Sequence, residues 1–169
     1  MKVFAQTGLT LEVANPRLDL IDATVRLTDK VPDLRVVLGH LQALPLPTDP
    51  GVLKTYSENP REFRRRKFYA KVSGLPRPAD GQSQSDPASY KPMLDFIWDI
   101  FGEDSIVFAA GWSRVAQKPS PIERMKTNLN IFQTYLRAKG RPAEEKFFWQ
   151  NSVRAFRWVR RDSKQPQLA

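Results

Sequence analysis

The sequence predicts an α/β domain built on a parallel sheet of about four strand–helix units. Short, continuous apolar runs recur along the chain, and such runs are typical of parallel strands that are buried on both faces. Segments with apolar residues three and four positions apart lie between these runs and predict helices. Proline, glycine and asparagine mark most of the boundaries. A chain of 169 residues is long enough to bury a substantial core in one domain.

The first part of the chain shows a strand, a helix and a second strand. The stretch "LTLEVAN" alternates apolar and polar residues, which predicts a strand over residues 9–15. An Asn-Pro pair, which supplies an N-cap and a first-turn proline, opens a predicted helix over residues 16–30. The apolar run "LRVVLGH" then predicts a buried strand over residues 34–40.

A long connection leads to the third strand. Residues 41–66 are rich in proline at first and basic afterwards, and a connection of this length is expected to contain some helix. The stretch "KFYAKVSGL" predicts a strand over residues 67–75. Asp86 is the expected N-cap of the helix that follows, and Gly102 ends that helix.

A strand and two helices complete the pattern. The run "SIVFAAGW" predicts the fourth strand over residues 105–112. The capping box "SPIE" starts a helix that Gly140 closes. A last helix is expected over residues 141–161, which completes a domain of residues 1–161, and residues 162–169 are expected to form a flexible tail.

The composition excludes several classes of protein. No apolar stretch approaches the roughly 20 residues that a membrane-spanning helix needs, and the N-terminus lacks the apolar centre of a signal peptide. The chain has no cysteine, hence no disulfides or thiolate metal sites, and a cytoplasmic location is expected. Its single histidine cannot supply the set of about three ligands that a catalytic zinc takes. We therefore expect no self-contained metal centre and no cofactor.

Four segments, in register, resemble a known family. The segments "PDLRVVLGHL", "FYAKVSGL", "FGEDSIVFAAGW" and "KFFWQNSVRAFRW" are similar to the C-terminal half of the amidohydrolase-related family, in its lactonase-like branch. The likeness runs from about Leu9 to Arg161. The family fold is a (β/α)8 TIM barrel, which typically takes about 250 residues. The resemblance therefore implies the last four strand–helix units of such a barrel, without the first half.

The resemblance assigns a catalytic position to His40. Family members carry a histidine at this strand end, where barrel enzymes place catalytic groups, and it would polarise a substrate carbonyl or ligate a metal. The pattern alone fits a histidine near a strand end with a backbone partner better than it fits a catalytic group, and the resemblance reverses this preference. At the end of the last strand the family places an aspartate as general base or metal ligand, and Gly111 stands there in this chain. Since general-base catalysis is typically worth about 10²- to 10⁴-fold, this change alone is expected to remove most activity.

Lys71, Ser73 and Trp112 are the expected substrate-binding residues. Lys71 and Ser73 share one face of their strand, and in an enclosed barrel this face points to the centre. The alternative is that one of them pairs with a neighbouring carboxylate. Trp112 stands at the end of the last predicted strand and would line the mouth of a pocket, although a large aromatic residue at such a place more often packs against the core.

The reaction implied by the resemblance is hydrolysis of a lactone, another ester or an amide-like C–N bond in a small carbonyl substrate. Water would add to a carbonyl polarised by His40, with help from Lys71. Some family members bind a divalent metal, but this chain lacks the ligand set. With half of the barrel absent, the isolated chain is expected to have little or no activity. A further hypothesis is that Met1 is internal to a longer enzyme, which an upstream codon pattern for H-x-H would reveal.

Two basic segments support a different hypothesis. Residues 61–67 hold five basic side chains with aromatic residues interleaved, and residues 154–161 repeat this pattern in a chain of net charge +9. Such segments would suit a module that binds nucleic acid or another polyanion. Neither matches a known nucleic-acid-binding module, so the hydrolase interpretation is preferred and binding to nucleic acid is not expected.

The edges of a half-barrel are also expected to matter. Its first and last strands, near residues 9–15 and 105–111, would have unpaired backbone edges and apolar side chains. We therefore expect self-association, with the pairing of two copies into a barrel-like dimer as one outcome.

Overall fold

The four predicted strands form one parallel sheet. The computed structural model describes residues 1–14, 18–39, 60–75, 86–110, 121–165 and 167. The strands are β1 (Thr10–Val13), β2 (Arg35–Leu38), β3 (Phe68–Val72) and β4 (Ile106–Phe108). They lie in the order β1-β2-β3-β4, and every neighbouring pair is parallel. This arrangement confirms the predicted fold class, because a partial TIM barrel has parallel strands in sequence order.

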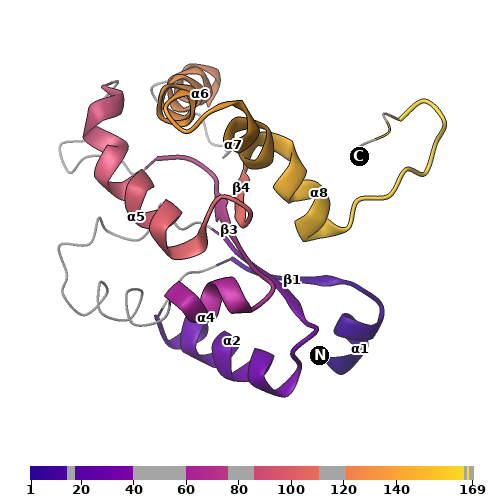
Figure 1. The fold of residues 1–169 in the computed structure, drawn as a ribbon. Helices are drawn as coiled ribbons and strands as arrows, with labels where there is room; N and C mark the ends of the chain where they lie inside the picture. Colours follow the sequence, from indigo (N-terminus) through magenta and orange to yellow (C-terminus); the bar gives the residue numbers. More distant parts are fainter. Residues whose placement is uncertain (15–17, 40–59, 76–85, 111–120, 166, 168–169) are drawn as a thin grey trace.

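Helices cover the outer face of this sheet (Figure 1). They are α2 (Leu18–Lys30), α4 (Pro60–Arg65), α5 (Lys91–Phe101) and α6 (Pro121–Arg137). Alternate strand residues, among them Val36, Ala70 and Ile106, are at most 2% exposed and belong to the main core. Side chains from all four helices complete that core, including Ile21, Phe63, Ile97 and Phe132.

The opposite face of the sheet, which we call the inner face, is partly covered by the helix α8 (Asn151–Phe156). Ala155 is fully buried there in a small cluster with Val37 and Val107. The hydroxyl of Thr10 donates to the Ala155 carbonyl at 2.6 Å, which fixes α8 near the start of β1. Figure 1 shows α8 across the strands from α4 and α5. The inner face is thus covered toward the amino ends of its strands.

Three residues predicted to mark helix ends have that role in the structure. The Asp86 carboxylate accepts a hydrogen bond from the Ala88 N–H at 3.1 Å and caps a 3-10 turn, η2 (Pro87–Tyr90), that continues into α5. Gly102 ends α5 with a positive φ of 74°. Gly140, with φ of 95°, closes the turn after α6, where its N–H donates to the Leu136 carbonyl at 3.0 Å.

The last predicted helical segment is present but ends earlier than predicted. Residues 141–161 form α7 (Arg141–Glu145), a π-helical turn η3 (Lys146–Gln150) and α8, which ends at Phe156. Arg157 adopts a left-handed conformation with φ of 48°, and the Trp158 N–H donates back to the Val153 carbonyl at 3.0 Å. The π turn contains the buried Phe147 and is followed directly by the buried Asn151.

Other expectations are extended or left untested. A short helix, α1 (Lys2–Gln6), precedes β1 and has no counterpart in the predicted elements. Within the described residues, no helix has the length and apolar character needed to cross a bilayer. β1 and β4 are the edge strands of the sheet, and self-association through them stays a prediction. The flexible tail over residues 162–169 also stays a prediction.

Candidate active site

An ion pair lies on the inner face near the carboxyl ends of the strands. Lys71 on β3 donates from Nζ to the Glu12 carboxylate on β1, so the pair spans the intervening strand β2. The Lys71 side chain is 18% exposed and that of Glu12 is 36% exposed. The Lys71 side chain is thus partly buried, whereas the Glu12 carboxylate is exposed and solvent screens the pair on that side.

Gly39, at the end of β2, lies beside the Glu12 carboxylate. A Cβ atom at Gly39 would lie 3.4 Å from the Glu12 Oε1 and 3.4 Å from the Val13 carbonyl oxygen. The Gly39 N–H donates to that carbonyl at 2.8 Å, which holds the end of β2 beside β1. The residue directly before His40 in the sequence is therefore fixed against the carboxylate of the ion pair.

The structure keeps two of the predicted site residues together. Lys71 is on the inner face, and the alternation of the strand continues to Ser73, which is 7% exposed. Lys71 pairs with a carboxylate, as the structural alternative proposed, and its contact with substrate stays a prediction. His40, Gly111 and Trp112 lie outside the described residues, so their predicted roles are also untested.

Glu12 is a site residue that the sequence did not single out. Its signal was its position as the charged residue in an otherwise apolar and threonine-containing strand. The part of the chain that the structure describes contains no group of three or more His, Cys, Asp or Glu side chains that would hold a metal ion. Glu12, the carboxylate of this site, is engaged by the Lys71 ammonium. The described residues of this site therefore do not by themselves supply a ligand set for a divalent metal.

Comparison with known proteins decides the family. The profile of the amidohydrolase family matches residues 3–158, which is most of the chain. The chain belongs to the amidohydrolase family. No curated protein matches it. A solved structure, amidohydrolase 2 from Bifidobacterium longum subsp. infantis, matches with a TM-score of 0.57 and 24% sequence identity over 91% of this chain, which shows the fold.

The amidohydrolase domain spans about half of that relative, since the match covers 52% of the other chain. The family and the partial barrel expected from the four sequence segments are thus confirmed, whereas the lactonase-like branch is not. In the barrel fold, catalytic groups lie at the carboxyl ends of the strands. The ion pair on the inner face lies toward this end, opposite to the part that α8 covers.

The basic segment near α4 has a structural role in this amidohydrolase domain. Phe63 and Phe68, two of the three aromatic residues interleaved with its charges, are 2% and 1% exposed and are not available to stack on bases, whereas the third, Tyr69, is partly buried. Arg66 forms a salt bridge with Asp29 at 2.6 Å and donates to the Thr28 hydroxyl at 2.8 Å. These contacts do not favour the polyanion-binding hypothesis.

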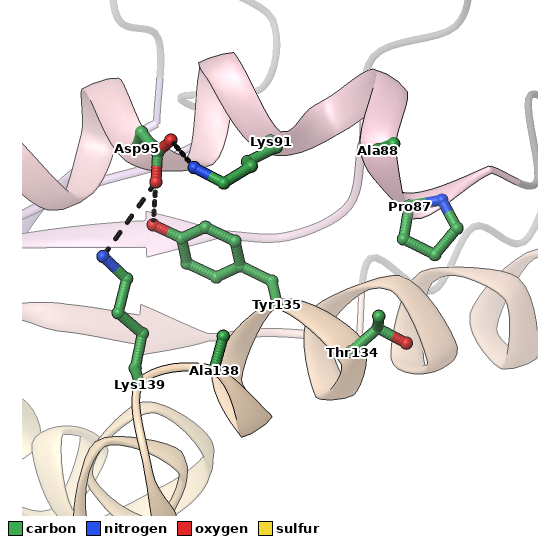
Figure 2. A pocket seen from close by; sticks show the side chains of 8 residues that line it. All are labelled: Pro87, Ala88, Lys91, Asp95, Thr134, Tyr135, Ala138 and Lys139. Atoms are coloured by element: carbon green, nitrogen blue, oxygen red, sulfur yellow. Dashed lines mark hydrogen bonds and ion pairs between the residues drawn. The ribbon is translucent and has the colours of Figure 1, made fainter.

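A separate cavity of about 380 Å³ lies between α5 and α6, on the helical side of the domain (Figure 2). Asp95 from α5 accepts hydrogen bonds from Lys91 on the same helix and from the Tyr135 hydroxyl, the latter at 2.9 Å. The Lys139 ammonium lies 4.0 Å from this carboxylate and 5.1 Å from the centre of the Trp98 ring. Figure 2 shows the Tyr135 side chain from α6, and the Lys139 side chain from the turn after α6, pointing toward Asp95. This cluster ties the two helices together.

Acidification is expected to weaken this cluster. The hydrogen bond from Lys91 holds the pKa of Asp95 below its ordinary value of 3.8, against the opposing effect of burial. Burial, helped by the hydrogen bond to Asp95, raises the pKa of Tyr135 above its ordinary value, so the phenol stays a donor. A carboxyl group with a lowered pKa stabilises the folded state at neutral pH, and this stabilisation is lost as the pH falls below about 4 through the folded pKa.

Asp95→Asn is therefore expected to lower the free energy of unfolding by about 1 kcal/mol at pH 7. Between about pH 5 and pH 3 the variant should lose less stability than the wild type, because it lacks the carboxyl group that takes up the proton. Urea unfolding at several pH values measures both effects. Asp99→Asn removes an exposed carboxylate from the same helix and is the matched control. A parallel pH dependence of wild type and Asp95→Asn would contradict the assignment.

Proposed function

We propose that this amidohydrolase domain takes part in the hydrolysis of a small carbonyl substrate at the carboxyl ends of its strands. The substrate class is a lactone or another ester, as in the lactonase-like branch, or a compound with an amide-like C–N bond. Support comes from the Lys71–Glu12 pair, which brings an ammonium and a carboxylate to the inner face at the edge where barrel enzymes carry their sites. The composition favours the cytoplasm as the compartment.

The proposed chemistry uses the ammonium as an electrostatic group. When water adds to the substrate carbonyl carbon, the carbonyl oxygen gains negative charge, and a hydrogen bond from Lys71 would stabilise that charge. Glu12 orients Lys71 through their ion pair. His40, which follows β2 in the sequence, is proposed as the second group that polarises the carbonyl.

The proton transfers in this reaction require a general base that this chain lacks at position 111. The attacking water must give up a proton, and the leaving oxygen or nitrogen must receive one when the C–O or C–N bond breaks. The family's aspartate would take the proton from water, and Gly111 has no side chain that does so. Glu12 is the carboxylate that the structure places beside Lys71, but it is already engaged by the ammonium. We propose that the chain alone has little or no hydrolase activity.

This proposal is tested with the purified chain and a panel of lactones, aryl esters and amides. The expected rate is no higher than that of the His40→Ala variant. Gly111→Asp is expected to raise hydrolysis of a susceptible lactone by about tenfold, because it restores a general base to a site of which this chain carries one part. Lys71→Met should remove this gain, and Lys126→Met, which removes an exposed ammonium from α6, should not. Enzyme-like rates that His40→Ala abolishes would contradict the proposed inactivity, and an unchanged rate in Gly111→Asp would contradict the site.

A further inference from the structure

A second cavity, of about 240 Å³, lies at the opposite end of the sheet from the candidate active site. Arg35, the first residue of β2, and Lys67, directly before β3, line it together with Asp33 and Arg157. The loop between α1 and β1, with Gly8 at its centre, forms another wall. Since the amino ends of β2 and β3 define this cavity, it is distinct from the site near Lys71.

The charges in the cavity are unbalanced. Its lining residues carry three cations, Arg35, Lys67 and Arg157, and one carboxylate, Asp33, which leaves two positive charges in excess. The carboxylate already pairs with Lys67 at 2.9 Å. Among the residues that the structure describes, neither arginine has a carboxylate partner within salt-bridge distance. Within these residues, the Arg35 Nη1 donates only to the Gly8 carbonyl oxygen, at 3.5 Å. Like charges that converge without partners destabilise a fold unless an anion joins them.

The backbone is specialised at two points of this cavity. Within the described residues, Arg157 is the non-glycine residue with a positive φ, a conformation that costs of order 1 kcal/mol and is found mainly where the surrounding structure uses it. Gly8, with φ of 72°, lets the Arg157 guanidinium lie directly on its Cα, where any Cβ would overlap the Nη1 atom. The end of α8 and the α1–β1 loop are therefore shaped to bring Arg157 to Gly8.

We propose that this cavity binds a small tetrahedral oxyanion: phosphate, or the phosphate group of a monoester. A doubly charged phosphate balances the two excess positive charges and offers an oxygen to each of the two guanidinium groups and to the ammonium. Guanidinium groups bind phosphate through paired, charge-assisted hydrogen bonds. The volume is smaller than the roughly 300–1,000 Å³ of sites for drug-sized ligands, which suits an ion or the head group of a larger molecule. This site does not depend on the proposed hydrolase activity.

The test is calorimetric titration of the full chain with inorganic phosphate and, separately, with phenyl phosphate, at constant ionic strength. Saturable binding of one phosphate per chain is expected, with a rise in the melting temperature. Arg157→Gln and Arg35→Gln should each weaken binding by about tenfold, because each removes a charged donor. Tighter binding of the monoester than of phosphate would assign the site to a larger ligand, and equal binding would assign it to the free ion.

Arg160→Gln is the matched control. It removes the same charge three residues away, from a side chain that is exposed, that donates to the Asp162 carbonyl at 3.0 Å and does not line the cavity. Arg157→Lys, which keeps the charge but loses the planar fork, should retain part of the affinity. Circular dichroism verifies that each variant is folded. Failure of the wild type to bind phosphate at millimolar concentration, or equal weakening by Arg157→Gln and Arg160→Gln, would overturn the proposal.

Discussion

Replacement of Asn151 by leucine is expected to lower the free energy of unfolding by about 2–4 kcal/mol. Asn151 is fully buried, and its Nδ2 donates to the carbonyl oxygens of Glu103 and Ile106, both at 2.8 Å. These carbonyls lie before and at the start of β4. Leucine has a similar size but no donor, so both carbonyls would lose this partner, and a buried polar group without a partner costs about 1–3 kcal/mol.

Asn130→Leu is the matched control for this prediction. Asn130 is exposed on α6, so the same chemical change there removes no buried hydrogen bond and is expected to stay within about 0.5 kcal/mol of the wild type. Urea unfolding followed by circular dichroism compares the two variants. Equal stability of Asn151→Leu and Asn130→Leu would show that the contacts of Asn151 with the β4 segment do not hold the C-terminal helices in place.

The fold was predictable because its signals are local. The apolar runs of β2 and β4 and the capping carboxylate of Asp86 each lie within a few residues of the element that they specify. Such a signal can be interpreted without knowing which strand lies beside it. Lys71 and Ser73 could be assigned to one face for the same reason, because alternation within a single strand places both side chains.

The parts that could not be predicted depend on distant contacts. Glu12 meets Lys71 across β2, and that contact follows from the strand register, which the sequence pattern does not state. The packing of Ala155 against Val37 and Val107 joins α8 to two strands far away in the sequence, and the five residues of the π turn before α8 carry no separate signal. The contact of Arg157, which caps this helix, with Gly8 joins residues nearly the whole chain apart.

Phe63→Ala is expected to lower the free energy of unfolding by about 3–5 kcal/mol, the range for deletion of a large buried aromatic side chain. Phe63 is 2% exposed, and its ring centre lies 5.5 Å from that of Phe68 on β3 and 5.3 Å from that of Phe101 on α5. One side chain thus joins α4 to the sheet and to the next helix. Its removal leaves a cavity that three separate elements must close.

The contrast with Phe156→Ala makes this prediction specific. Phe156 is 45% exposed at the end of α8, so its loss is expected to cost less than about 1 kcal/mol. Guanidinium chloride unfolding of both variants gives the difference between their free energies of unfolding.

The Phe63→Ala and Phe156→Ala variants also distinguish the two interpretations of the basic segment around α4. If Phe63 served to stack on nucleic-acid bases, its removal would lower the affinity for single-stranded DNA and leave stability nearly unchanged. A large loss of stability instead identifies the ring as part of the core, with the neighbouring arginines as the solvated side of the same helix.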